Sequence, residues 1–179
     1  MLVLDYESRE PGTVSCPSRP LATSPRNVAL GIKARNPMPT ITQIELVQKT
    51  FAIVAPIADD VAALFYRRLF EIDPSLESMF KGNAADQRRK LMVMLTAAVK
   101  GLPRLDRLIP VLEDLGRRHA EYGVADGQYE TVGEALLWTL EKGLGPEFTP
   151  EVRDAWTTVY GVLAATMKAG VEERLAEAV

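Results

Sequence analysis

From residue 40 onward, apolar side chains recur every three or four positions, and the apolar–polar alternation of half-buried strands does not appear. Capping residues and prolines divide this pattern into about seven helices with short connections. The first is expected to begin at a cap, Thr40 or Thr42, and to end near Val54. The others are expected at about 57–71, 74–80, 86–101, 105–119, 126–143 and from 149 past 167. The pattern predicts one all-α domain.

Residues 1–39 have a different composition. They contain six prolines together with glycine, serine and arginine, and they show no apolar period. We expect a disordered N-terminal tail over 1–39 and a folded domain over 40–179. Met38 lies just before the helical pattern, so the tail is either an overlong start assignment or a genuine extension. Its Cys16 is the only cysteine of the chain.

Composition narrows the class of protein. The chain has 179 residues, 47% of them hydrophobic and 25% charged, with a net charge of −3, so no basic field favours nucleic acid. A single cysteine excludes an intrachain disulfide and fits a reducing compartment. No apolar run reaches the ~18 residues that span a bilayer, and the N-terminus lacks the pattern of a secretory signal. These features predict a cytoplasmic protein without a membrane span.

His119 is the only histidine, and it follows Leu108, Leu112 and Leu115 on the apolar face of its predicted helix. In an arbitrary helical protein, such a residue is most often a core histidine with its hydrogen bonds satisfied. A neutral imidazole facing an apolar pocket is also suited to haem iron, which one proximal histidine can hold. With one histidine and one cysteine in the tail, no multi-residue zinc or non-haem iron cluster of these ligands can form. Both interpretations of His119 stay open at this point.

Two polar residues lie on otherwise apolar helical faces. Tyr66 has apolar neighbours along its face, and Gln87 precedes Leu91 by four residues and Leu95 by eight. Tyr66 is either a core aromatic with its hydroxyl at the edge or a hydrogen-bond donor in a pocket. Gln87 is either an exposed first-turn residue or a second donor. Since bound O2 takes up partial negative charge, two donors in a dry pocket would favour it over uncharged ligands.

Several short motifs across residues 41–168 together resemble a known family, although no single motif would be enough. Their order and spacing resemble the bacterial single-domain haemoglobins, relatives of the globin domain of flavohaemoglobins. The resemblance implies a globin fold, about seven helices around a haem pocket, with haem b (iron protoporphyrin IX) as cofactor. The motifs are Leu64-Phe65-Tyr66, Leu69-Phe70, Asp73-Pro74, Met79-Phe80, Gln87 to Met92, Leu115 to His119, Tyr122-Gly123-Val124, Tyr129, Val132-Gly133, Ala155-Trp156 and Val159 to Val162.

The resemblance also implies residue roles. His119 matches the proximal iron ligand, and Tyr129, ten residues later, matches the tyrosine beside it. Tyr66 and Gln87 match the distal residues that stabilise the gas ligand. Arg118, or its neighbour Arg117, either reaches a haem propionate or belongs to a solvated pair. The further predicted haem contacts are Phe80, Leu91, Leu95 and Val132.

Three functions are consistent with these roles. The first is reversible binding of O2, with NO and CO as further gaseous ligands. The second is a nitric oxide dioxygenase supplied with electrons by a separate reductase, since the chain has no room for a flavin domain. The third is a gas or redox sensor with a protein partner. The set His119, Phe80, Tyr66 and Gln87 argues against a globin fold without haem, and the oligomeric state stays open between monomer and weak homodimer.

Two details qualify the resemblance. In flavohaemoglobins, a glutamate eleven residues after the tyrosine that matches Tyr160 joins the proximal network. Here that position is Val171, and the glutamates are Glu172 and Glu173. One residue rotates a helical side chain by ~100°, so either the helix shifts locally or the network is missing. The chain also has no second histidine for the opposite side of the iron, which predicts five-coordinate ferrous haem.

Overall fold

The computed structural model describes residues 38–80 and 82–177. All the regular secondary structure in these ranges is helical, which confirms the predicted all-α class. The predicted tail lies outside the described residues except for its last two positions. The α-helices are α1 (Ile41–Val54), α2 (Ala58–Ile72), α3 (Ala84–Gly101), α4 (Leu105–Glu121), α5 (Asp126–Leu144) and α6 (Pro150–Glu177). The 3-10 helices between them are η1 (Ala55–Ile57), η2 (Pro74–Met79), η3 (Leu102–Arg104) and η4 (Gly145–Glu147).

Some of the predicted capping residues begin helices, and others do not. Thr40 caps α1, because its hydroxyl accepts the Gln43 N–H at 3.2 Å while the Gln43 amide oxygen accepts the Thr40 N–H at 2.9 Å. The predicted start of the fourth helix at Asp86 is wrong. The cap is Asn83, whose side-chain oxygen accepts the Ala85 N–H at 2.8 Å, so α3 begins at Ala84. Gln87 therefore lies one full turn inside the helix.

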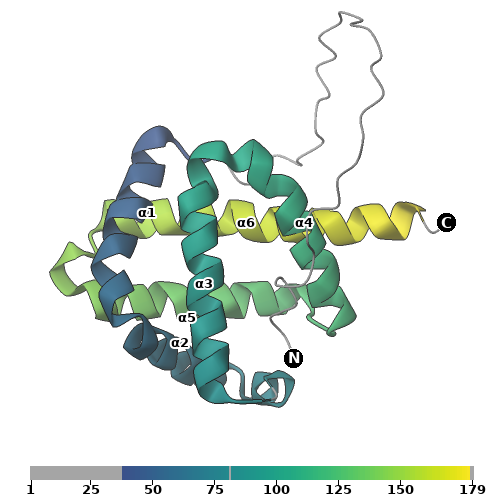
Figure 1. Cartoon of the computed structure of the whole chain (residues 1–179), viewed down its shortest axis with the longest axis horizontal. Helices are drawn as coiled ribbons and strands as arrows, with labels where there is room; N and C mark the ends of the chain where they lie inside the picture. Colours follow the sequence, from purple (N-terminus) through teal and green to yellow (C-terminus); the bar gives the residue numbers. More distant parts are fainter. Residues whose placement is uncertain (1–37, 81, 178–179) are drawn as a thin grey trace, which may run out of the picture.

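The helices form two crossing layers (Figure 1). α5 and α6 run across the molecule, and α3 passes over both of them at a steep angle. α1 packs against α6, α2 against α5, and α4 crosses the far part of α6. The apolar faces meet between these layers and bury side chains such as Val47, Leu69 and Val159 almost completely. Over residues 38–80 and 82–177, no helix has both the length and the hydropathy to cross a membrane.

The helices α4 and α6 approach each other closely where they cross. A Cβ atom built on Gly116 would lie 1.9 Å from the backbone oxygen of Met167, and one on Gly170 would lie 2.5 Å from the backbone oxygen of Glu113. The two backbones therefore touch, and only glycine fits at each position because any side chain would collide with the other helix. Gly116 lies one turn before His119, so α6 fixes the part of α4 that carries the histidine.

We predict that Gly116→Ala destabilises the fold, because the methyl group of the new alanine must push α4 away from the α6 backbone. Overpacking of this kind costs about 1–3 kcal/mol in the free energy of unfolding. Urea denaturation followed by circular dichroism measures the loss. Gly127→Ala is the matched control, since a Cβ at Gly127 meets no atom within 4 Å and alanine favours a helix. Equal stability of the two variants would contradict the role of the crossing.

Candidate functional site

His119 lines a cavity of about 130 Å³ enclosed by residues of α2, η2, α3, α4 and α5. Apart from His119, Tyr66 and Gln128, the lining is apolar. The structure thus brings five of the predicted site residues to one cavity: His119, Tyr66, Phe80, Leu91 and Val132. The other lining residues are Phe65, Leu69, Leu76, Met79, Val124 and Gln128.

The imidazole of His119 is held in one tautomer. Its Nδ1 lies 2.8 Å from the backbone oxygen of Leu115, one turn earlier on α4. Since a carbonyl oxygen only accepts, Nδ1 carries the proton and donates it, which leaves the lone pair on Nε2. Burial lowers the pKa of His119 below its usual value of 6.5, although the hydrogen bond to Leu115 opposes this shift. At neutral pH the cavity therefore contains a neutral imidazole with a free nitrogen for a metal ion.

Tyr129 lies against His119. Their ring centroids are 6.2 Å apart with an interplanar angle of 26°, and burial raises the pKa of the phenol. The Tyr160 hydroxyl on α6 donates to the Tyr129 carbonyl oxygen at 2.5 Å. Gly133 makes room for this contact, because a Cβ there would lie 2.6 Å from the Tyr160 ring. Tyr129 is therefore supported from α6 and lies beside the histidine, as predicted.

Lys168 is an α6 side chain that reaches the Tyr129 ring. Lys168 Nζ lies 5.2 Å from the ring centroid, whereas Glu172 is exposed to solvent. Of the two alternatives that the sequence left open, the structure thus shows no local shift of α6 that turns Glu172 inward.

An aromatic cluster lies at the cavity wall formed by α2 and the residue after η2. The Tyr66 ring lies edge-on to Phe80 at 5.2 Å between centroids, and Phe70 is 5.6 Å from Phe80. The Tyr66 hydroxyl donates to the backbone oxygen of Gln87 at 3.3 Å. Burial raises the pKa of Tyr66 to about 12, so the phenol keeps its proton at neutral pH. Tyr66 is thus both a core aromatic and a proton-bearing group at the cavity.

Gln87 is buried, with 6% of its surface exposed, so the interpretation as an exposed first-turn residue is wrong. The physical reason is that α3 starts earlier than predicted, so Gln87 lies beyond its first three residues and on the apolar face, where its backbone oxygen contacts the Tyr66 hydroxyl. It lies next to the cavity through its backbone contact with Tyr66, although it is not one of the lining residues.

Arg118 is engaged on its own helix. Its guanidinium pairs with Asp114, one turn earlier, and Arg117 pairs with the same carboxylate at 3.6 Å. Both arginines are partly exposed, and neither lines the cavity of His119. The structure therefore matches the solvated pair that was one of the two predicted alternatives.

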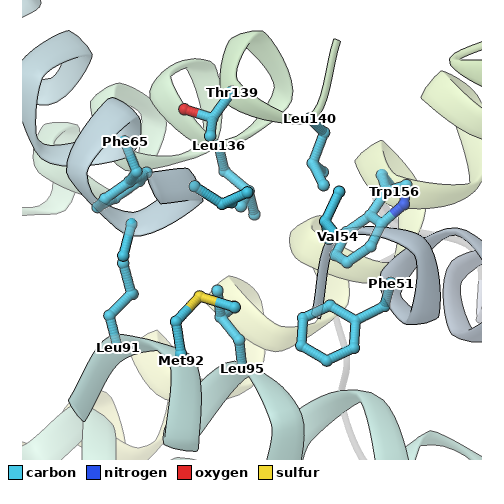
Figure 2. Close-up of a pocket in the computed structure, with 12 residues that line it drawn as sticks. Phe51, Val54, Phe65, Leu91, Met92, Leu95, Leu136, Thr139, Leu140 and Trp156 are labelled. Carbon is cyan, nitrogen blue, oxygen red and sulfur yellow. The ribbon is translucent and has the colours of Figure 1, made fainter. Parts of the chain in front are cut away.

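A second, smaller cavity adjoins the first (Figure 2). Phe65 and Leu91 line both cavities, and Leu95 lines only the second. Figure 2 shows Met92 and Leu95 on one wall, Leu136 and Leu140 opposite, and Phe51 beside Trp156. The polar atoms nearby are paired away from the space: Thr139 donates to the Ala135 carbonyl at 2.8 Å, and the Trp156 ring nitrogen donates to Thr50 at 3.0 Å. The predicted contact of Leu95 thus lies one cavity away from His119.

Sequence reasoning missed Gln128 as a lining residue. Its side-chain oxygen accepts the Ala125 N–H at 2.9 Å at the start of α5, and its amide nitrogen lies 3.8 Å from the sulfur of Met79. The position three residues after a helix cap was a usable signal. What the sequence could not show is that this start of α5 lies against η2.

Comparison with known proteins identifies the family. The globin family profile matches residues 63–167. Neuroglobin of Danio rerio is 35% identical over 121 residues, which cover 60% of this chain and 76% of that protein. The chain belongs to the globin family. The flavohemoprotein of Bacillus subtilis is 30% identical over 139 residues, 75% of this chain but only 34% of that longer protein.

Solved structures agree with this assignment. A bacterial globin from Campylobacter jejuni superposes with a TM-score of 0.67 at 22% identity, covering 76% of this chain and 99% of that one, which supports the fold. A structure described as an engineered carbene transferase, a putative nitric oxide dioxygenase from Rhodothermus marinus, gives a TM-score of 0.68 at 25% identity. It covers 76% of this globin and 96% of the other chain.

The globin family implies haem, and the donor set of this cavity fits that group. A neutral imidazole with a free Nε2 is the ligand that haem iron takes from a protein, and an otherwise apolar wall suits the porphyrin faces. The volume fits less well. Pockets for small molecules measure roughly 300–1,000 Å³, so the walls around the present 130 Å³ must move apart to admit the group.

We predict that His119 titrates below pH 6.5 in the haem-free protein, because burial disfavours the charged imidazolium. Below 6.5 the unfolded chain then binds more protons than the folded chain. The contribution of His119 to the free energy of unfolding is therefore fully present above pH 6.5. It is lost as the pH falls from 6.5 to the pKa of His119 in the folded protein. NMR of the ring protons measures this without ambiguity, since the chain has one histidine. The prediction would be contradicted if the titration midpoint of His119 in the folded protein were equal to or higher than its midpoint in the urea-unfolded protein.

Proposed function

We propose that this globin holds haem b through His119 and binds O2 reversibly, with NO and CO as alternative ligands. The observation that carries the proposal is the state of His119: a neutral imidazole with Nδ1 bound to Leu115 and Nε2 free, at an otherwise apolar cavity. Haem supplies an iron that binds diatomic gases in its ferrous form. The protein supplies the axial nitrogen, the dry surroundings and the polar groups on the gas side.

The cavity residues have distinct roles in this proposal. Phe80, Leu91 and Val132 line the cavity and would exclude water from a bound haem, which would favour its ferrous state. Tyr129 keeps the imidazole plane of His119 fixed by stacking. Arg118 is left out of the binding site, because it would have to leave Asp114 to reach a carboxylate of the group.

Tyr66 supplies the polar group on the gas side, and Gln87 acts on it through a backbone contact. Tyr66 lines the cavity and keeps its phenolic proton, since its pKa is raised to about 12. Its hydrogen bond to the Gln87 carbonyl is long at 3.3 Å, so a better-placed acceptor in the cavity can compete for the proton. Until such an acceptor binds, the Gln87 carbonyl holds the Tyr66 hydroxyl at the cavity.

We predict that the purified protein takes up haem and that its reduced form has a five-coordinate spectrum that changes on addition of CO. His119→Ala loses the haem or shows an altered spectrum, because no other histidine can replace the ligand. Absorption spectra of the reduced proteins, with and without CO, measure both effects. Val111→Ala on the exposed face of α4 is the control and keeps the wild-type spectrum. No haem uptake by the wild type, an unchanged spectrum in His119→Ala, or a six-coordinate low-spin reduced spectrum would each contradict the proposal.

We predict that Tyr66→Phe releases O2 about 5- to 10-fold faster, which corresponds to the loss of one hydrogen bond of ~1 kcal/mol. Stopped-flow displacement of O2 by CO measures the release rate. Tyr122→Phe is the matched control, since it removes a phenolic hydroxyl from a side chain that is 40% exposed. Equal release rates in both variants would show that Tyr66 is only a packing residue.

Nitric oxide dioxygenation is the second candidate function. It is favoured by the similarity to a flavohemoprotein and to a putative nitric oxide dioxygenase. This reaction combines one NO, one O2 and one electron into nitrate, so a reductase is needed to supply the electron. Rapid mixing of the oxygenated protein with NO, followed by turnover with an added reductase, distinguishes the candidates. Sustained nitrate formation favours the enzyme, whereas a single turnover favours gas binding.

A further inference from the structure

Lys168 links α6 to the ring that supports His119. Its ammonium nitrogen lies 5.2 Å from the Tyr129 ring centroid and 3.9 Å from a carboxylate oxygen of Asp126, at the start of α5. The same Tyr129 ring stacks with His119 at 6.2 Å. The contacts therefore run in sequence from Asp126 through Lys168 and Tyr129 to His119.

The position of Lys168 is set by the helix crossing. Its neighbour Met167 contacts the α4 backbone at Gly116, and Gly170 contacts it at Glu113, so α6 cannot slide at this point. The side chain of Lys168 is 30% exposed, whereas that of Asp126 is 88% exposed. Solvent therefore screens the carboxylate more strongly than the ammonium. Burial raises the pKa of Tyr129, and the Asp126 carboxylate adds to this, so the positive charge of Lys168 acts on the ring against that of Asp126.

We propose that Lys168 is a positioning residue for His119, which holds the Tyr129 ring against the imidazole and places a positive charge on the proximal side of the site. The first half concerns the protein alone. The second half rests on the proposed function, because the charge acts on the iron that His119 would hold. A cation attracted to an aromatic face stabilises the ring in place. A nearby positive charge also opposes the extra charge of ferric iron and so favours the ferrous form.

Lys168→Met keeps the aliphatic stem and removes the charge. In the haem-loaded protein, we expect its ferric–ferrous midpoint potential to fall. A unit charge about 10 Å away at an effective dielectric constant of 40–80 changes the ferrous-to-ferric ratio at a fixed potential by about two- to fourfold. Asp126→Asn leaves Lys168 unopposed and is expected to shift the potential upward. Spectroelectrochemical titration at low and high salt measures both shifts, which screening should reduce at high salt.

Two further variants separate charge from packing. Lys168→Arg keeps a cation over the ring and should retain the wild-type potential. Lys142→Met is the matched control, because Lys142 also lies over an aromatic ring, 5.7 Å from Trp138, and the net charge changes equally. Trp138 is nine residues along α5 from Tyr129, about 14 Å at 1.5 Å per residue. If Lys168→Met shifts the potential no more than Lys142→Met, the electrostatic half is wrong.

A haem-free measurement tests the positioning half separately. The ring ¹⁵N and ¹H signals of the single histidine report its contact with the Tyr129 ring through the ring current. We expect Lys168→Met to shift these signals and Lys142→Met to leave them unchanged. An unchanged His119 signal in Lys168→Met would overturn this half. If the wild type takes up no haem, the proposed function fails, and this measurement alone still decides whether Lys168 positions His119.

Discussion

The contact between the α4 and α6 backbones is the constraint on which the rest of the site depends. Gly116 and Gly170 let the two helices touch, so the segment that carries His119 is fixed by a helix whose sequence begins about thirty residues later. The same α6 supplies Tyr160 and Lys168, which contact Tyr129 from two positions two turns apart. One helix therefore controls the position of the histidine, the ring beside it and the local charge.

The two sides of the cavity are built by different means. On the side of His119, hydrogen bonds and stacking fix each group: Nδ1 to Leu115, and Tyr160 to the Tyr129 backbone. On the side of Tyr66, packed rings dominate and the polar contact to Gln87 is long. The His119 side is therefore held by short hydrogen bonds, while the Tyr66 side keeps a proton-bearing group that can change partners.

Much of the fold followed from the spacing of apolar residues and from capping chemistry. Thr40 was one of the two caps expected for the first helix, and the face of His119 followed from the leucines one, two and three turns before it. Local errors arose where two residues compete for one role, as Asn83 and Asp86 do at the start of α3. The contacts of Gly116 and Lys168 could not be predicted, because they depend on the angle at which two distant helices cross. A shift of one residue rotates a side chain by ~100°, so spacing alone cannot decide which α6 side chain reaches Tyr129.

Phe65 and Leu91 separate the cavity of His119 from the second apolar cavity, and this partition is a single layer of side chains thick. A change of volume at either residue therefore alters both spaces at once. A bulkier side chain at Leu91 would narrow the binding chamber and the chamber behind it together, and a smaller one would merge them. Selection for the size of one chamber in this globin is thus coupled to the size of the other.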